Sequence, residues 1–463
     1  MQHEDMTMDP KSSTSHSTLL IKGASILTMD PDLGDLEAGD IFIEDGKIAD
    51  VAHSIEAPHA EIIDARDMIA IPGFVDTHRH LWEGLLRNAL PDGTLSDYFS
   101  VVNERFGPAY EPKDVYYGTL LSALGAVNAG VTTVLDWAHI QNSPEHTDAS
   151  IAALRDSGIR AVFAFGTPTA DRGHKYPGDI LRLRREVFSS DDQLLTLALA
   201  TASPEYAPDE VVKAQWRIAR EADARITVHA GIAGICRAGE IGRFGHEGML
   251  GPDVTLVHCA TLSETEWKIL ADTGTTVSIS TPIEMQMGHG QPPIQQAIDA
   301  SLAPSLSVDV ETSAPGDFFT QMRTTLAVQR GMAFARAHSG SEQPALLGVR
   351  DVLGYATVAG ASANGLSHKI GSISLGKQAD LVLLKIGVNV MPVNDLAGAV
   401  VLGMDVSNVD TVLVGGKMLK RNGTLIGVDL DRLRTHVYEA RDRVFRNADV
   451  CCFHSRHDHL ASH

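Results

Sequence analysis

The sequence is poor in cysteine, in basic side chains and in long hydrophobic runs. Four cysteines in 463 residues exclude a disulfide-stapled scaffold. With 38 Lys and Arg against 59 Asp and Glu, the formal net charge is −21, and an acidic chain repels the phosphates of nucleic acids. No apolar run reaches the ~18 residues that a membrane-spanning helix needs. We expect no nucleic-acid partner, no membrane and a cytoplasmic location.

What the chain does have is a globular composition and many histidines. Hydrophobic residues make up 44% of the sequence, which is enough to bury a large core. Twenty residues are histidine, a side chain that serves both as a metal ligand and as an acid or base near neutral pH. The positions of these histidines in the fold therefore bear directly on function.

Both ends of the chain have the pattern of short β-strands joined by glycine turns. Alternating runs at residues 19–27 and 40–48 include the tight-turn sequence Glu44-Asp45-Gly46-Lys47. Matching runs appear near the other end, at residues 376–384 and 409–417. This arrangement predicts one small composite β-sandwich domain built from both chain ends, with a larger domain inserted between them.

Between about residues 70 and 365, short apolar runs alternate with segments of helical length. The eight runs lie at residues 71–76, 132–136, 161–165, 194–199, 225–228, 255–257, 276–279 and 304–308. Apolar strands that alternate with helices are typical of a parallel α/β sheet. Eight repeats favour a (β/α)8 TIM barrel over an open doubly wound sheet, which would carry a G-x-G-x-x-G turn after its first strand.

The domain prediction divides the chain into four parts. The N-terminal segment is polar and lacks the apolar core of a signal peptide, so we expect a disordered leader there. The C-terminal tail, which holds two cysteines and several histidines, is expected to be flexible. The predicted parts are the leader at 1–17, the composite β domain at 18–69 plus 366–428, the metal-dependent catalytic barrel at 70–365, and a C-terminal helix and tail at 429–463.

Several histidines follow the predicted barrel strands, whose carboxyl ends carry the chemistry in barrel enzymes. Residues two apart in an extended chain point to the same side, so His78 and His80 converge. His229 ends the fifth run, His258 the sixth, and Asp309 the eighth. Imidazoles and a carboxylate gathered at one barrel mouth predict a site for one divalent cation.

These strand-end motifs resemble the amidohydrolase superfamily, in its mononuclear branch that includes cytosine deaminases and triazine hydrolases. The resemblance spans about residues 19–423, and it is strongest in Ile71-Pro72-Gly73-Phe74-Val75-Asp76-Thr77-His78-Arg79-His80 and in Gly376-Lys377-Gln378-Ala379-Asp380-Leu381. The fourth strand does not end in lysine, so the two-metal variant with a carbamylated lysine is not expected. The resemblance implies one ion, zinc first with iron, manganese or cobalt as alternatives, and it implies these ligands: His78, His80, His229 and Asp309.

The same resemblance assigns the proton-transfer groups and exposes one departure. His258 is implied to stabilise an oxyanion, and Asp309 to act as the general acid and base. Deaminases of this branch usually carry a glutamate three residues after the strand-5 histidine, and this chain has Ile232 there. That glutamate passes protons to a ring nitrogen, so its loss favours hydrolysis of another kind of C–N bond.

We therefore expect a metal-activated hydroxide to hydrolyse an amide, urea or carbamate-like C–N bond in a small compound, cyclic and aromatic ones included. Two alternatives stay open: an aminohydrolase that deaminates an N-heterocycle, and an inactive barrel that serves as a binding or structural subunit. Enzymes of this kind form dimers or larger assemblies, so a homo-oligomer is expected.

Other polar side chains follow the predicted strands and are expected to contact a small-molecule substrate. Glu284 and His289 come after the seventh strand, where they are candidates to substitute for the acid lost at Ile232. The full set is Arg79, Trp82, Arg87, His139, Glu205, Glu284 and His289.

Overall fold

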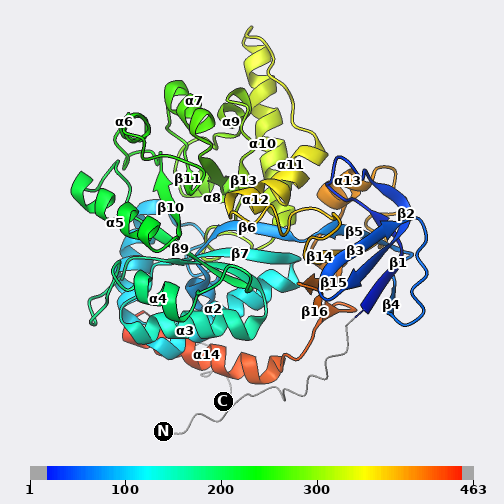
Figure 1. The fold of residues 1–463 in the computed structure, drawn as a ribbon. Helices are drawn as coiled ribbons and strands as arrows, with labels where there is room; N and C mark the ends of the chain where they lie inside the picture. The colour runs from blue at the N-terminus through cyan, green and yellow to red at the C-terminus, as the bar shows by residue number, and fades with distance from the viewer. Residues whose placement is uncertain (1–17, 451–463) are drawn as a thin grey trace, which may run out of the picture.

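The computed structural model describes residues 18–450. They form a barrel surrounded by helices, with a curved β-sheet beside it (Figure 1). The predicted leader at 1–17 lies outside the described residues, as does the tail from 451 onward.

Strands from both chain ends form the sheet beside the barrel. Their hydrogen-bonded order is β17-β16-β15-β14-β5-β1-β2-β3, with β4 paired to β1. The two halves meet where β5 pairs antiparallel with β14, so they form one continuous sheet rather than two separate sheets of a sandwich. Ile21 and Ile41 share a core with Leu381 and Leu413, so the sheet curves over itself. The strands are β1 (Thr18–Ile26), β2 (Leu36–Glu44), β3 (Lys47–Ala52), β4 (Glu61–Asp64), β5 (Met68–Pro72), β14 (Leu381–Lys385), β15 (Val409–Val414), β16 (Lys417–Arg421) and β17 (Thr424–Leu425).

The barrel consists of eight parallel strands, and each of the eight predicted runs overlaps one of them. The strands are β6 (Phe74–Arg79), β7 (Val131–Ala138), β8 (Arg160–Phe165), β9 (Leu195–Thr201), β10 (Arg225–Ala230), β11 (Val254–His258), β12 (Thr276–Ile279) and β13 (Ser305–Leu306). They pair in chain order from β6 to β13. The ends of this path meet through Asp309, whose N–H donates to the carbonyl of His78 and whose carbonyl accepts from His80 N–H, both at 2.9 Å.

The first predicted strand is divided where the sheet and the barrel join. Ile71 and Pro72 belong to β5, and the barrel strand begins only at Phe74. Gly73 makes the division possible, because a Cβ there would lie 2.0 Å from the Thr132 Oγ1 atom. The barrel strand therefore starts and ends later than predicted, and His78 lies inside β6 rather than after it.

Helices cover the outside of the barrel, and α14 packs beneath it against α2 (Figure 1). The helix α7 is typical, with Ser263 and Glu266 forming a capping box at its start and Gly274 in a left-handed conformation at its end. None of the helices in residues 18–450 combines the length and hydropathy needed to cross a bilayer. The helices are α1 (Leu95–Tyr98), α2 (Pro112–Asn128), α3 (Pro144–Ser157), α4 (Ile180–Glu186), α5 (Asp209–Glu221), α6 (Glu240–His246), α7 (Glu264–Thr273), α8 (Thr281–Gln286), α9 (Ile294–Asp299), α10 (Phe318–His338), α11 (Val349–Tyr355), α12 (Val358–Ala363), α13 (Leu396–Gly398) and α14 (Leu430–Asn447), with the short turns η1 (Leu81–Leu86), η2 (Phe99–Phe106), η3 (Gly107–Ala109), η4 (Ala399–Gly403) and η5 (Val406–Asn408).

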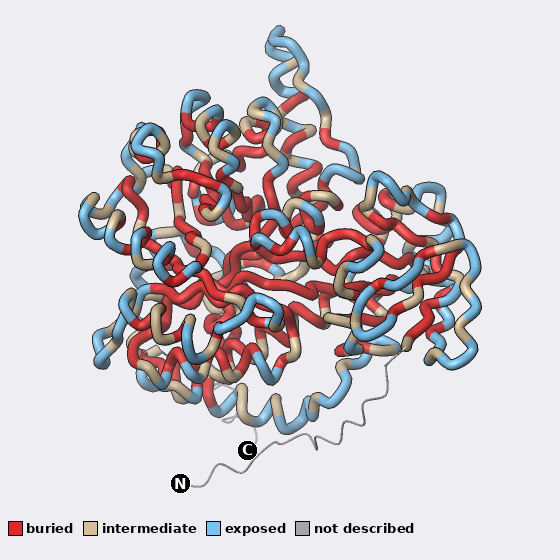
Figure 2. Tube along the Cα trace, in the orientation of Figure 1, coloured by how far each residue is buried: buried red, intermediate tan, exposed pale blue. Residues whose placement is uncertain are grey.

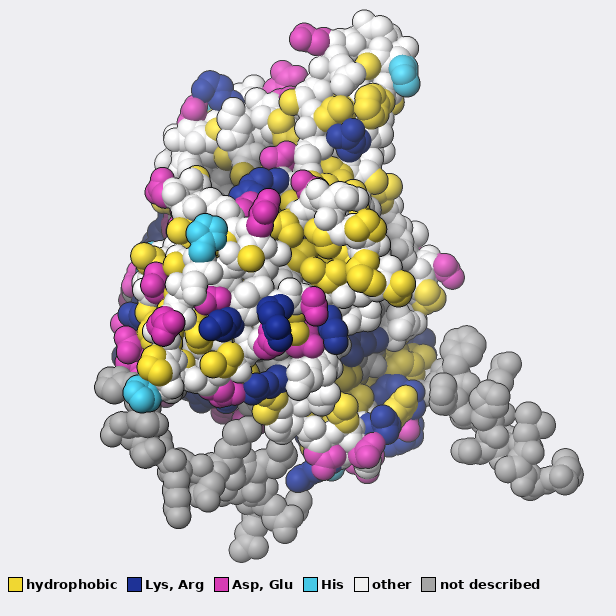
Figure 3. Space-filling model, turned by 90° about the vertical axis from the view of Figure 1, so that its right-hand side faces the viewer, with side chains coloured by type: hydrophobic (Ala, Val, Ile, Leu, Met, Phe, Trp, Pro, Cys, Tyr) yellow, Lys and Arg dark blue, Asp and Glu magenta, His cyan; other side chains and the backbone are white. Residues whose placement is uncertain are grey.

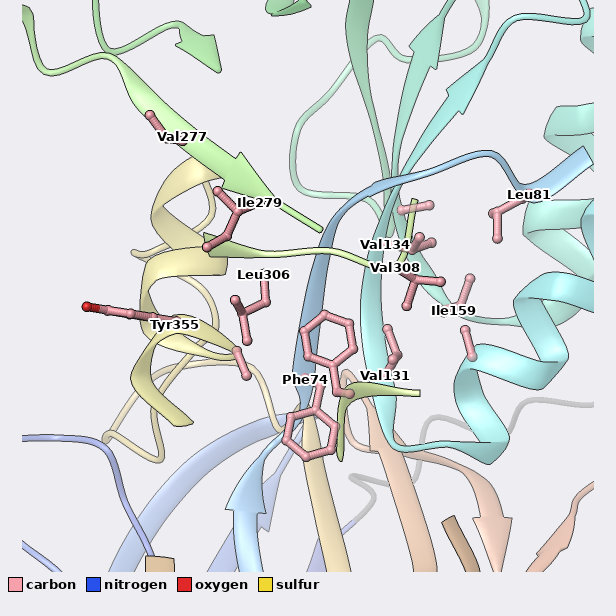
Figure 4. Close-up of a cluster of buried hydrophobic side chains, with 14 of the residues drawn as sticks. Phe74, Leu81, Val131, Val134, Ile159, Val277, Ile279, Leu306, Val308 and Tyr355 are labelled. Atoms are coloured by element: carbon pink, nitrogen blue, oxygen red, sulfur yellow. The ribbon is translucent and has the colours of Figure 1, made fainter. Parts of the chain in front are cut away.

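The apolar core fills the space between the barrel strands and their helices. The strands are buried almost throughout, and the exposed segments are the helix faces and loops (Figure 2). Phe74, Leu306 and Val308 lie in one cluster (Figure 4), and the Phe74 ring stacks on Phe318 with centroids 5.5 Å apart. Acidic and basic side chains are mixed on the face seen in Figure 3. The core holds the strand ends, and hence the candidate site, in fixed positions.

Candidate metal centre and its cavity

Four side chains that sequence reasoning named as metal ligands converge at the mouth of the barrel. The Nε2 atom of His78 lies 3.1 Å from Oδ1 of Asp309 and 3.2 Å from Nε2 of His229. The Nε2 atom of His80 lies 3.4 Å from the same carboxylate oxygen. The other ring nitrogen of His80 is hydrogen-bonded to the Trp137 carbonyl at 3.0 Å, which turns Nε2 toward the cluster.

The spacing of these atoms suits one divalent cation. Tetrahedral ligands at the Zn–N distance of about 2.0–2.1 Å lie roughly 3.3 Å from one another, close to the separations found here. The Nε2 atoms of His78 and His229 both point at the same spot, and only one of them can donate a hydrogen bond to the other. A cation resolves this crowding because it accepts a lone pair from each ring. The donor set therefore fits a metal ion.

His258 lies beside this cluster and is held from behind by a buried carboxylate. Its Nε2 atom is 3.7 Å from Oδ2 of Asp309, and its Nδ1 atom is 3.3 Å from Oε1 of Glu284. Glu284 Oε1 also accepts the Ser280 N–H at 2.8 Å. His258 has a backbone φ of 76° and Asp309 one of 66°, conformations that non-glycine residues rarely adopt and that cluster at functional sites. The backbone is thus bent to aim both side chains.

A cavity of about 420 Å³ opens above the cluster. His80, His229, His258 and Asp309 line its floor. Its walls come from loops that follow several strands and from the segment between β6 and α2. The wall residues include Tyr98, Phe99, Trp137, Tyr206, Ile232, Ile235 and Met287. A concave, mainly apolar site with a few convergent polar groups is typical of small-molecule binding.

Of the seven expected substrate contacts, two line this cavity and five lie behind its wall. His139 and His289 line it. Glu284 orients His258, as described above. The Trp82 indole N–H donates to His139 Nδ1 at 3.4 Å, and Glu205 accepts the Gly231 N–H at 2.8 Å. These three contacts support the site from outside the cavity.

Arg79 and Arg87 also lie outside the cavity, and both form ion pairs with the buried carboxylate of Glu311. Arg79 Nη2 lies 2.7 Å from Glu311 Oε1, and Arg87 Nη2 lies 3.0 Å from the same atom. Arg79 Nη1 is 3.3 Å from Asp76 Oδ2. Because adjacent residues of a strand face opposite sides, Arg79 points away from the side to which His78 and His80 point. Neither arginine lines the cavity, and the ion pairs of both brace the barrel mouth.

Sequence reasoning missed the residues of the wall between β6 and α2. Tyr98 and Asn103 line the cavity from this segment, and Tyr98 donates a hydrogen bond to the buried Glu83 at 2.5 Å. Asn103 Oδ1 lies 3.0 Å from His139 Nε2. The segment carries no strand-end signal, because it forms short helical turns whose position depends on contacts far away in the sequence.

Comparisons with known proteins agree with this architecture. A 5'-deoxyadenosine deaminase of Methanosarcina barkeri is 27% identical over 443 residues, covering 92% of this chain and 98% of the relative. A 5-methylthioadenosine/S-adenosylhomocysteine deaminase of Acetivibrio thermocellus is 26% identical over 453 residues, covering 92% and 100%.

Solved structures confirm the α/β fold, with a (β/α)8 barrel and an added sheet. An adenosine deaminase of Xanthomonas campestris with bound zinc matches with a TM-score of 0.80 at 22% identity, covering 93% of this chain and 99% of that one. Atrazine chlorohydrolase of Arthrobacter aurescens, complexed with zinc, matches with a TM-score of 0.79 at 23% identity, covering 91% and 100%.

The model of one protein family, described as the amidohydrolase family, matches residues 69–419. The match extends from β5 through the whole barrel and into β16, so it includes every side chain of the converging cluster. The resemblance that the strand-end motifs suggested is confirmed, and this chain belongs to the amidohydrolase family.

Proposed function

We propose that this protein is a metal-dependent hydrolase that cleaves a C–N bond, of amide, urea or carbamate type, in a small organic compound. The observation that carries the proposal is the convergence of three imidazoles and Asp309 on one point at the floor of an apolar cavity. His78, His80, His229 and Asp309 would hold the ion. Zinc is the preferred metal because two structural neighbours contain it, with iron, manganese or cobalt as alternatives.

An ion held by His78, His80, His229 and Asp309 would supply Lewis acidity and would lower the pKa of bound water from about 15.7 toward 7. The Asp309 carboxylate accepts a proton from the water whose oxygen attacks the carbonyl carbon. His258 donates a hydrogen bond to the carbonyl oxygen as negative charge develops there, and Glu284 keeps the ring in this orientation. When the C–N bond breaks, Asp309 returns the proton to the leaving nitrogen.

The single carboxylate at the floor of the cavity supports this choice of reaction. The cavity side chain at position 232 is isoleucine, which cannot exchange a proton with a ring nitrogen. Asp309 alone can carry out both transfers when the leaving nitrogen departs from the same carbon that the water attacks. A reaction that needs a second acid on the far side of the substrate is less favoured, because position 232 provides no acid.

A second candidate is an aminohydrolase that releases ammonia from an N-heterocycle. The names of the relatives favour it, because they are deaminases of 5'-deoxyadenosine and of related nucleosides. The same floor residues would serve, and ammonia would be the leaving group. The two candidates differ in the product nitrogen, so a product assay separates them.

The test is metal analysis of the purified protein, followed by assays on amides, ureas and aminoheterocycles that detect amine and ammonia separately. We expect about one divalent ion per chain and release of a substituted amine. Release of ammonia from aminopurines would favour the second candidate. A metal-free protein that hydrolyses these compounds at full rate would overturn the proposal.

We further propose that the enzyme acts in the cytoplasm as a homo-oligomer. The few cysteines and the acidic charge support the first point. Light scattering of the purified protein tests the second, and a monomer at micromolar concentration would contradict it.

A further inference from the structure

The cavity above the metal cluster contains little that could pair with a charged compound. Within residues 18–450, its lining includes no lysine, arginine or glutamate, and its only carboxylate is Asp309, a proposed metal ligand. Aromatic and aliphatic side chains form most of the surface, among them Phe99, Trp137, Ile232 and Met287. A cationic or anionic ligand would lose its hydration there without gaining a partner.

Apolar side chains also form the rim of the cavity. Phe99 is 41% exposed, Tyr206 46% and Ile235 38%, although all three line the cavity. Large apolar side chains that are exposed together at the mouth of a cavity are characteristic of a binding site for apolar compounds. The entrance and the interior thus favour the same kind of ligand.

Several polar groups of the cavity wall already have partners within the protein. Tyr98 donates to Glu83 at 2.5 Å, and His139 Nε2 lies 3.0 Å from Asn103 Oδ1. The Thr201 hydroxyl accepts the indole N–H of Trp216 at 3.0 Å. These contacts fix the positions of the side chains that shape the wall.

His289 is different, because it lines the cavity with two buried ring nitrogens that have no such partner. Its side chain belongs to a residue that is 3% exposed, and neither ring nitrogen has a hydrogen-bond partner anywhere in residues 18–450. A buried polar group without a partner is costly, so a partner from outside the protein is expected. Burial lowers the pKa of His289 to about 3, so the neutral ring offers one donor and one acceptor.

The backbone fixes His289 next to the segment that carries Ile232. The Ala233 N–H donates to the His289 carbonyl at 2.8 Å. In addition, a Cβ at Gly290 would lie 2.8 Å from the Ala260 Cβ atom, which shows how tightly this loop packs on its neighbours. His289 therefore lies beside the position at which related deaminases carry their acid.

We propose that the substrate is a neutral aromatic or heteroaromatic compound without a charged tail, and that His289 anchors it through a hydrogen bond to one of its heteroatoms. The proposal rests on the proposed function, because it takes the metal cluster to be the reacting end of the cavity. Phe99 and Trp137 contact the ring faces, and the cluster receives the C–N bond. His289 is thus a specificity-determining residue beside His258, whose ring centroid lies 4.4 Å from that of His289.

The test is equilibrium binding to the zinc-loaded protein, measured by calorimetry with matched probes. Benzamide and benzamidine have nearly the same shape, but benzamidine is cationic at neutral pH. We expect benzamide to bind more than about tenfold more tightly than benzamidine. Equal or tighter binding of benzamidine would overturn the proposal, as would failure of benzamide to bind at millimolar concentrations.

The role of His289 is tested with two variants and a control. His289→Phe removes both ring nitrogens and should weaken benzamide binding several-fold, to about tenfold. His289→Gln keeps a donor and an acceptor and should recover part of the loss, whereas His53→Phe, at an exposed site far from the cavity, should change nothing. Unchanged binding in a correctly folded His289→Phe protein would refute the anchor. Loss of metal or of hydrolysis in the unmodified enzyme would instead refute the proposed function.

Discussion

Two clusters of buried charged and polar side chains flank strand β6, and they differ in how well their charges are balanced. Toward the cavity, His78 and His80 meet Asp309, with ring nitrogens and a carboxylate oxygen crowded within 3.4 Å. On the other side, Arg79 meets Glu311 and Asp76. In this second cluster each cation faces an anion, and no further ion is needed to balance the charges.

The contrast shows how a protein can build a rigid support and a binding site from adjacent residues of one strand. The balanced cluster ties β6 to the segment after β13, since Glu311 also binds Arg87 and accepts the Ser122 hydroxyl at 2.5 Å. The cavity cluster gathers lone pairs that have no cation among the described residues. We infer that the first cluster contributes stability and the second contributes function, and the following variants test that division.

The largest effect is expected for Asp309→Asn in the cavity cluster. The amide cannot accept the proton and is a weaker metal ligand, so kcat/KM should fall by more than about 10⁴-fold, beyond the usual range of general acid–base catalysis alone. His78→Ala should behave similarly and should also reduce the bound metal. Turnover assays with metal analysis measure both quantities.

The control for this prediction is the midpoint of denaturant unfolding of the metal-free proteins. It should change little, because removing a crowded ligand does not leave a buried charge without its partner. A metal-free Asp309→Asn protein that unfolds much more easily than the unmodified chain would show that the cavity cluster is structural as well.

The next largest effect is expected for Glu311→Gln in the balanced cluster. The change leaves the buried Arg79 and the partly exposed Arg87 without their shared partner, and loss of one member of a buried ion pair typically destabilises a protein by about 3–5 kcal/mol. Metal content at low temperature should persist, because Glu311 is not a ligand. The free energy of unfolding measures the loss, and an unchanged value would contradict the assignment of this cluster to stability.

Much of this architecture is predictable from the sequence, because it follows from local patterns. The eight apolar runs identify the barrel strands, and the strand-end rule leads to His229, His258 and Asp309. The same rule does not predict that Arg79 lies outside the cavity. A strand end carries side chains on both sides, and only alternate ones face the cavity. The residues beyond the ends, such as Glu205, are placed by loop conformation.

Other features depend on contacts that no local pattern contains. The left-handed backbone of His258 and Asp309 results from packing around the barrel mouth, since even the non-glycine residue types that are enriched in that conformation adopt it only rarely. Tyr98 reaches the cavity because the segment between β6 and α2 folds over it. The apolar nature of the cavity emerges only when these loops are assembled.

A smaller effect is expected for Glu284→Gln, which alters the support behind the cavity cluster. Gln can still accept a hydrogen bond from His258, but it lacks the negative charge that favours the donating ring. Loss of such an outer partner typically costs about 10–100-fold in activity. Kinetic assays should show a fall in kcat with bound metal unchanged, whereas loss of metal would mean that Glu284 helps to hold the ion.

The smallest effect is expected where opposite charges meet in water. Lys268 and Asp272 form an ion pair at 2.8 Å on the surface of α7, with side chains 74% and 62% exposed. Its separation nearly equals that of the Arg79–Glu311 pair, so the two pairs differ chiefly in burial. Lys268→Ala should change the free energy of unfolding by no more than about 0.5 kcal/mol, because water solvates the remaining carboxylate. A loss as large as that of Glu311→Gln would mean that pairing itself, rather than the burial of an unmatched charge, determines what each cluster contributes.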